Sequence, residues 1–246
     1  MWRAFVSLGH IAVDFLFPRL CCGCGERVFE SCELVCPRCL KSVRQLTQPL
    51  CPVCGMEDAP AGRKCEHCPA GEIFFSAARA VAPYEGVART IVERLKYNYR
   101  EEYAPWMAMR MLEVARSEFA HVAFDAVVPV PLHRTRRRER GFNQSELLAH
   151  PIAKAFRVPL ALSALRRVRN TPSQTKLNKR ERADNIRDAF SVPDPPAIHG
   201  KVFLLVDDVY TTGATLNECA RVLRAGGARD VYCLSFCRAT LQSFAN

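Results

Sequence analysis

One stretch, VFLLVDDVYTTGAT at residues 202–215, constrains the fold more than any other part of the chain. Its five apolar residues, 202–206, predict a central buried strand, and Asp207 and Asp208 follow where that strand would end. Small and hydroxylated residues come next, and a segment with helical periodicity starts near residue 216. A buried strand that leads through a short loop into a helix is the repeating unit of a parallel α/β sheet.

The same alternation of strand and helix patterns continues on both sides of this stretch. We expect further strands at 78–83, 124–130 and 231–237, and helices from Gly86, over 104–119 and over 146–156, with Pro151 as a break or kink. The polar, basic segment 166–187 is predicted to be a mobile loop with a short helix. The predicted fold is α/β: a doubly wound, mostly parallel sheet at 76–246, preceded by a small cysteine-rich head at 21–75 and an N-terminal helix at 1–20.

Composition and the first residues bear on the class of protein. With 49% hydrophobic and 24% charged residues, the 246-residue chain is typical of a globular protein rather than a disordered one. No apolar run reaches the roughly 18 residues that would span a bilayer. His10 and Asp14 interrupt the apolar pattern of the first residues, and no small-residue cleavage site follows. We therefore predict a short packing helix rather than a signal peptide or surface anchor, and a cytoplasmic protein.

Cysteine spacing predicts a metal-binding head. Ten of the 13 cysteines lie between residues 21 and 68, and eight of them form four CxxC pairs: Cys21/Cys24, Cys36/Cys39, Cys51/Cys54 and Cys65/Cys68. Two such pairs supply four thiolates at the corners of a tetrahedron, the arrangement that structural zinc prefers. We expect two closed zinc sites, with redox-active dithiols or incidental thiols as the alternative. The pairs can combine in sequence order or interleave, and Cys22 or Cys32 can replace a neighbour.

The residues that follow the two aspartates favour an anion. Five of them form a loop at the mouth of the predicted helix: Thr211, Thr212, Gly213, Ala214 and Thr215. Backbone N–H groups and the helix dipole there attract phosphate. Carboxylates would repel phosphate, so Asp207 and Asp208 must serve vicinal hydroxyls and a magnesium ion. A sugar 5-phosphate meets both demands; the alternative is an acidic strand end that closes an unrelated phosphate or metal site.

At these residues VFLLVDDVYTTGAT resembles the phosphoribosyl pyrophosphate signature of type I phosphoribosyltransferases. Together with RGFNQ (140–144), the polar segment 166–190 and the cysteine pairs, it resembles the competence protein F (ComF) family over nearly the whole chain. The resemblance implies that Asp207 and Asp208 are the catalytic, ribose-binding pair and that residues 211–215 hold the 5-phosphate. It also implies phosphoribosyl pyrophosphate with magnesium as ligand, and a role in the uptake or processing of transforming single-stranded DNA.

The loop that follows the predicted strand at 124–130 resembles the pyrophosphate loop of the same enzymes by its position. Its backbone over Pro129–His133, with the side chains of His133 and Arg134, would face the diphosphate. The alternative is that the two prolines of this loop only end the strand.

Positive charge is concentrated in one segment. Residues 131–190 contain 15 Lys or Arg and 5 Asp or Glu, a net charge of +10 that equals the net charge of the whole protein. Arginine engages phosphates in fork geometry, and Phe142 beside the run is placed to stack on a base. We predict a surface for single-stranded DNA on Arg136, Arg137, Arg138 and Arg140. A solvated helix face, or a loop that serves only pyrophosphate, is the alternative.

Two classes of function follow from the sequence. In the first, which we favour, a phosphoribosyltransferase fold binds DNA and uses its sugar-phosphate site for ligand sensing or for a strand end, together with proteins of the competence machinery. In the second, the protein is an enzyme that transfers a phosphoribosyl group to an acceptor. An enzyme needs a pocket for the acceptor base; the sequence reveals none, and the cysteine-rich head is the candidate hood.

Overall fold

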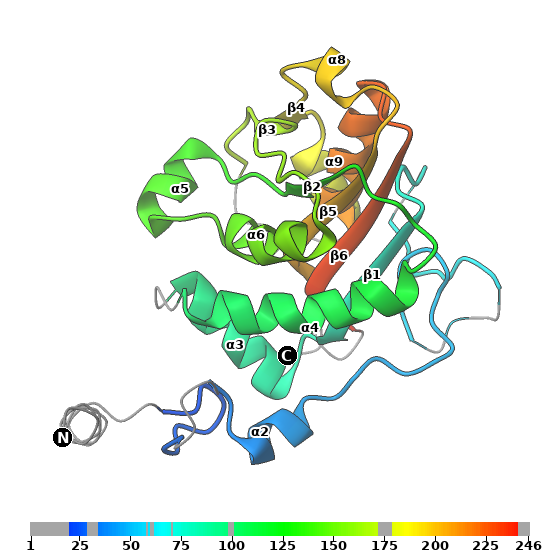
Figure 1. Ribbon diagram of the computed structural model, residues 1–246. Coiled ribbons are helices and arrows are strands. Elements are labelled where there is room, and N and C mark those ends of the chain that lie inside the picture. Colours follow the sequence, from blue (N-terminus) through cyan, green and yellow to red (C-terminus); the bar gives the residue numbers. More distant parts are fainter. Residues whose placement is uncertain are drawn as a thin grey trace.

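A computed structural model describes residues 20–28, 34–57, 59, 62–69, 71–97, 101–171 and 179–240 (Figure 1). The predicted N-terminal helix and Cys32 lie outside the described residues, as does the part of the predicted mobile loop at 172–178. No helix in the described ranges is long and apolar enough to cross a membrane.

Four parallel strands form the central sheet, in the order β1 (Ala77–Pro83), β6 (Asp230–Arg238), β5 (Val202–Tyr210) and β2 (Ala126–Pro129). The predicted strands are therefore confirmed, and β5 lies inside the sheet with β6 and β2 on its two sides. Both faces of β5 are buried, which explains why its first five residues are continuously apolar.

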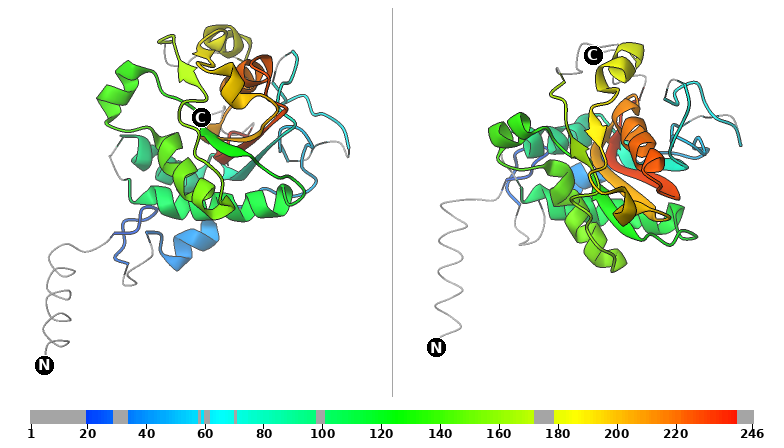
Figure 2. Two further views of the ribbon diagram at one scale, coloured as in Figure 1. Left: turned by 45° about the horizontal axis from the view of Figure 1, so that its top comes forward. Right: turned by 90° about the horizontal axis from the view of Figure 1, so that it is seen from above.

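Helices cover both faces of this sheet, as a doubly wound fold requires (Figures 1 and 2). Leu204 and Val206 of β5 pack into a core with three helices: α3 (Gly86–Tyr97), α4 (Tyr103–Glu118) and α6 (Gln144–Phe156). Phe203 and Leu205 face the other core, with α9 (Ala214–Ala225) and α7 (Lys179–Ile186). The helix α6 continues through Pro151, because Leu148 and Ile152 on either side of the proline are buried.

Some elements were not anticipated from the sequence. A short helix, α5 (Arg134–Arg140), occupies the arginine run; no residue in it is buried, so no apolar periodicity could reveal it. His133 caps its N-terminus, since Nδ1 of that histidine accepts a hydrogen bond from the amide of Thr135 at 3.3 Å. Two further short pieces were also missed: α8 (Pro195–Ile198), and an antiparallel pair formed by β3 (Arg166–Arg167) and β4 (Phe190–Ser191).

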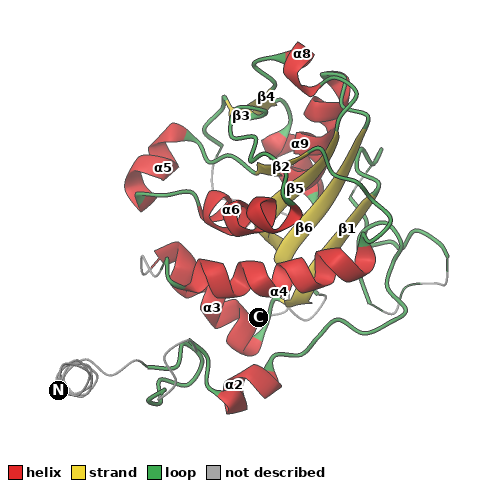
Figure 3. Ribbon diagram, in the orientation of Figure 1, coloured by secondary structure: helices red, strands yellow, loops and turns green. Residues whose placement is uncertain are grey.

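The cysteine-rich region contains little regular structure apart from α2 (Pro37–Ser42), and Figure 3 draws it almost entirely as loop. Its cysteines nevertheless belong to the two cores of the molecule. Cys21, Cys36 and Cys39 pack with the core on the α3 side of the sheet, whereas Cys51, Cys54, Cys65 and Cys68 pack with the core on the α9 side. The head is thus divided between the two faces of the sheet.

Candidate functional site

The strand β5 ends later than its sequence suggests. It continues to Tyr210, so Asp207 and Asp208 lie within the strand and not beyond its carboxyl end. The reason is that β6 keeps pairing with it: Asp207 lies opposite Ser235. On the other side β2 ends at Pro129, opposite Val206. The β2 side of β5 is therefore open beside the two aspartates, and ligands of open α/β sheets bind in such positions.

Asp207 is held by hydrogen bonds and has no ion pair within the described residues. Its Oδ1 accepts hydrogen bonds from the Ser145 hydroxyl and from the amide of Asp208, both at 2.9 Å. Burial, followed by repulsion from the Asp208 carboxylate, raises the pKa of Asp207 to about 7. A carboxyl group with this pKa changes charge near neutral pH. A ligand that brings a cation or hydroxyl donors would stabilise its charged form.

Asp208 is in a different environment. Its residue is 3% exposed, and its Oδ2 lies 3.0 Å from Nζ of Lys96 on α3. Burial alone would lower the pKa of Lys96, but attraction to Asp208 raises it above the usual value. Lys96 therefore stays charged and neutralises Asp208, and the two neighbouring aspartates are not equivalent.

The sequence RGFNQ ties the loop after β2 to the acidic residues. Asn143 caps α6, because its Oδ1 accepts from the amide of Ser145 at 3.1 Å. Its Nδ2 donates to the carbonyl of Val130 at 3.0 Å, and the Val130 amide donates to the carbonyl of Val206 on β5 at 2.9 Å. Ser145 then reaches Asp207. In the sequence, RGFNQ served only to identify the family resemblance. The roles of Asn143 and Ser145 come from the structure.

The loop 211–215 joins β5 to α9 and leaves amide groups unbonded. Gly213 caps α9 with φ +77°, and the first hydrogen bond within the helix runs from the Asn217 amide to the Gly213 carbonyl at 2.8 Å. The amides of the first turn point out of the helix and are available to an anion. Gly213 is required, because a Cβ there would lie 2.3 Å from Oη of Tyr210.

The raised pKa of Asp207 predicts a pH-dependent stability. In the unfolded chain an aspartate has a pKa near 4, so between about pH 4 and 7 the folded state binds more protons and stability falls as pH rises. Asn cannot lose a proton, so the stability of Asp207→Asn should lack this decline. From pH 5.5 to pH 8, the unfolding free energy of Asp207→Asn should therefore rise by at least about 1.4 kcal/mol relative to that of wild type, the free energy that corresponds to one pKa unit. Urea unfolding of both proteins at several pH values measures this. Parallel pH profiles for the two proteins would contradict the assignment.

The eight cysteines of the CxxC pairs form two clusters in sequence order and not interleaved. The first cluster is Cys21, Cys24, Cys36 and Cys39, and the second cluster is Cys51, Cys54, Cys65 and Cys68. Within each cluster the four sulfur atoms lie within 4.8 Å of one another. Cys22 is buried but belongs to neither cluster. Cys219, Cys233 and Cys237 are buried in the sheet and α9.

The chemistry of both clusters fits a structural zinc ion. The amide of Cys36 donates to Sγ of Cys21 at 3.2 Å, and the amides of Cys54 and Cys65 each donate to Sγ of Cys51 at 3.5 Å. Burial opposes ionisation of Cys21 and Cys51, but backbone N–H donors outweigh it and lower the pKa of each thiol to about 6. Four sulfur donors, with amide hydrogen bonds around them, form a closed tetrahedral site without an open position for substrate.

We therefore expect the protein purified under reducing conditions to contain two zinc ions per chain, one in each four-cysteine cluster. Elemental analysis of a desalted sample measures this ratio. The control is the same sample unfolded in chelator, which should retain none. A ratio below about one half, from a preparation whose thiols are reduced, would contradict both sites.

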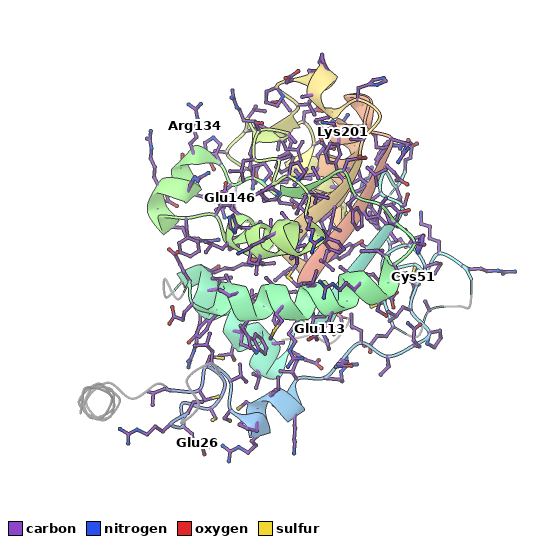
Figure 4. The ribbon with its side chains drawn as sticks, viewed as in Figure 1. Glu26, Cys51, Glu113, Arg134, Glu146 and Lys201 are labelled. Atoms are coloured by element: carbon purple, nitrogen blue, oxygen red, sulfur yellow. The ribbon has the colours of Figure 1, made fainter. Side chains whose placement is uncertain are left out.

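The arginines of the basic segment differ in their bonding. On α5, Arg137 forms a two-pronged ion pair with Glu146, at 2.7 and 3.0 Å, and Arg140 donates to Oε1 of Gln144 at 2.6 Å. Among the described residues, Arg136 donates only to the carbonyl of Thr171, at 3.5 Å. Within 134–140 and 166–187, four exposed arginine side chains have no hydrogen bond or ion pair to any residue in the described ranges, and we call them the open arginines: Arg134, Arg138, Arg166 and Arg180. Figure 4 shows Arg134 projecting from α5, away from the sheet.

The aromatic ring that is exposed near the arginine run is not the one that the sequence predicts. The expectation that Phe142 stacks on a base is wrong: its residue is 8% exposed and packs in the core on the α3 side. The exposed ring is instead Tyr97 at the end of α3, which is 68% exposed and lies 5.7 Å from the guanidinium of Arg140. Tyr97 lines a cavity of about 530 Å³ with Lys96, Arg136 and Arg140. Tyr97 lies far from the arginine run in sequence, so the sequence alone did not indicate that the two are neighbours.

Comparison with known proteins agrees with both halves of this arrangement. A family model described as Phosphoribosyl transferase domain matches residues 143–241, and one described as Double zinc ribbon domain matches residues 12–69. The DNA utilization protein YhgH of Salmonella typhimurium is 34% identical over 224 residues, which cover 90% of this chain and 97% of that protein. The chain belongs to the ComF/YhgH family.

More distant members of the family also align over most of the chain. Competence protein F of Haemophilus influenzae is 26% identical over 89% of this chain and 96% of its own length. Competence protein ComFC of Bacillus subtilis is 28% identical over 79% of this chain and 80% of its own length. The predicted family, the phosphoribosyltransferase-type α/β fold and the double cysteine head are therefore confirmed. The two cysteine clusters are those of the double zinc ribbon, and we call residues 20–42 the first ribbon and 50–69 the second ribbon.

Proposed function

We propose that this ComF/YhgH family protein binds phosphoribosyl pyrophosphate, or a similar sugar phosphate, at the open side of β5. The observation that carries the proposal is the convergence of three groups at that position: Asp207, the loop after β2 that Asn143 anchors, and the first turn of α9. Hydroxyl acceptors, a backbone loop and an anion site then serve the ribose, the diphosphate and the 5-phosphate.

The two aspartates contribute differently in this proposal. Asp207 carries no ion pair in the described part of the chain, so it accepts hydrogen bonds from the ribose hydroxyls. Asp208 is neutralised by Lys96 and positions the strand beside it. Thr211, Thr212, Gly213, Ala214 and Thr215 hold the 5-phosphate. His133 and the backbone of 129–133 face the diphosphate, whose charge a magnesium ion offsets when it binds with the ligand. Arg134, the other side chain expected at the diphosphate, projects away from the sheet, and we assign it to the DNA surface instead.

We further propose that the same protein binds single-stranded DNA. The open arginines come from α5, β3 and α7, and in Figure 1 α5 and β3 lie above α6 and α4, whereas α2 of the first ribbon lies below these helices. They supply phosphate contacts independent of sequence. Tyr97 is exposed beside Arg140 and offers a surface on which a base can stack, and it neighbours Lys96 beside the acidic pair. A strand bound there would pass close to the sugar-phosphate site.

The names of the relatives, DNA utilization protein and competence protein, favour a role in the uptake or processing of single-stranded DNA over nucleotide synthesis. We place this role in the cytoplasm, together with competence-machinery proteins. The alternative is a phosphoribosyltransferase with an unknown acceptor.

Release of pyrophosphate tests the two functions. The protein is incubated with phosphoribosyl pyrophosphate, magnesium and a panel of nucleobases, and Asp207→Asn is the matched control. We expect no release that depends both on an acceptor and on Asp207. Acceptor-dependent release that is lost in Asp207→Asn would overturn a role limited to binding and establish the enzyme.

A further inference from the structure

A buried arginine joins the second ribbon to the sheet. Arg238 is the last residue of β6 and is 1% exposed. Its Nη2 donates to Sγ of Cys54 at 3.1 Å, which connects two residues 184 positions apart in sequence. Its guanidinium carbon lies 4.0 Å from the ring centroid of Tyr210, the last residue of β5. Arg238 therefore contacts one member of the second cluster and the residue directly before the loop 211–215.

The positive charge of Arg238 offsets the negative charge of a zinc-bound second cluster. Four thiolates around one zinc ion carry a net charge of about −2, which is costly to bury without a nearby cation. Nε and Nη1 of Arg238 have no hydrogen-bond partner among the described residues. Since few hydrogen bonds hold the guanidinium in place, its position is explained by the sulfur of Cys54 and the face of Tyr210.

Tyr210 and the second ribbon then contact the loop directly. A Cβ on Gly213 would lie 2.3 Å from Oη of Tyr210 and 2.9 Å from Cγ of Pro69, so the loop rests on both residues. Pro69 follows directly after Cys68. Further along, Asn217 of α9 accepts from the Phe74 amide at 2.9 Å and donates to the carbonyl of Glu72 at 2.8 Å. The second ribbon and the chain after it thus support the loop and the first turn of α9.

The described residues of the first ribbon have no such link. Its cluster packs beside α3, where a Cβ on Gly23 would lie 3.1 Å from Cγ1 of Val87. In the described ranges, no hydrogen bond or ion pair joins residues 20–28 or 34–42 to the loop 211–215. Figure 4 shows Glu26 of the first ribbon and Cys51 of the second far apart. The first cluster is therefore an internal control for the second.

We infer that the second cluster, Arg238 and Tyr210 act as one unit that positions the loop 211–215, so that zinc in the second cluster controls affinity for the sugar phosphate. Arg238 is a positioning residue in this scheme and does not touch the ligand. The choice of a sugar phosphate as the ligand rests on the proposed function. The physical coupling between the second cluster and the loop 211–215 does not depend on that function.

The test compares wild type with Arg238→Met and Arg238→Lys. Native mass spectrometry at increasing chelator concentration counts the zinc ions, and hydrogen exchange follows the amides of 211–215 and of both ribbons. We expect Arg238→Met to lower zinc affinity of the second cluster by about 10- to 100-fold, the usual effect of losing a partner of a metal ligand. Exchange at 51–68 and 211–215 should rise together, while exchange at 21–28 and 34–39 stays unchanged. Arg238→Lys keeps the charge and should show a smaller change.

Calorimetry with phosphoribosyl pyrophosphate and magnesium completes the test. If the wild type binds, we expect affinity to fall at least about tenfold in Arg238→Met and when chelator removes the zinc of the second cluster from wild type, in line with a lost positioning contact. If the wild type does not bind, the proposed function fails, while the joint exchange change still supports the coupling. The inference is overturned if the second cluster loses zinc and neither the exchange of 211–215 nor the affinity changes.

Discussion

Replacing Asp208 with Asn should destabilise the protein by about 3 kcal/mol, because the change leaves the Lys96 ammonium charged and unpaired inside the domain. This value is at the lower end for a broken buried pair, since the Lys96 side chain keeps 19% exposure and can reach some water. Urea unfolding at neutral pH measures the loss.

Two controls separate the ion pair from a general effect of the substitution. The double change Asp208→Asn, Lys96→Met should recover most of the lost stability, because it removes both charges. Glu113→Gln breaks the exposed pair with Arg110 and should cost less than about 1 kcal/mol. A double variant as unstable as the single one would show that Lys96 and Asp208 do not depend on each other.

Changing all four open arginines to Gln should make the binding of single-stranded DNA much less sensitive to salt. Each phosphate contact contributes roughly −0.7 to the slope of log affinity against log salt concentration. Losing four contacts should therefore reduce its magnitude by up to about 3, equally for all base compositions. Fluorescence anisotropy with labelled oligonucleotides at several salt concentrations gives the slope.

The matched control removes the same total charge elsewhere. Four exposed cations outside this surface are suitable: Lys154, Lys201, Arg224 and Arg229. Their change to Gln should leave the slope within about one unit of wild type, because distant surface charges are screened. Equal losses in both quadruple variants would mean that net charge alone attracts the DNA and that the open arginines form no site.

Local patterns predicted the fold well, because burial of a strand or of one helix face produces a recognisable spacing of apolar residues in the sequence. The CxxC pairs likewise predicted two four-cysteine clusters. The extent of β5 was not predictable from residues 202–210 alone, since Asp207 and Asp208 stay in the strand only because β6 continues beside them. Similarly, α5 has no buried face, so only its caps at His133 and Gly141 indicate it.

The candidate site depended on contacts that no local pattern contains. Sequence treated the two aspartates as equal, but Lys96 of another element neutralises one of them. It placed a stacking role on Phe142 because of its neighbours, whereas burial excludes that role and Tyr97 is exposed. The contact of Arg238 with Cys54 spans 184 residues, so only the fold reveals it.

The central claim is that the open side of β5 binds a sugar phosphate, and calorimetric titration of phosphoribosyl pyrophosphate with magnesium tests it most directly. We expect the wild type to bind, and Asp207→Asn to bind about tenfold more weakly or worse, as expected for losing a charge-assisted hydrogen bond. Asn keeps the shape of the side chain and can still accept from Ser145, so the loss would report the charge. Equal affinity in both proteins, or no binding by a folded, zinc-loaded wild type, would contradict the claim.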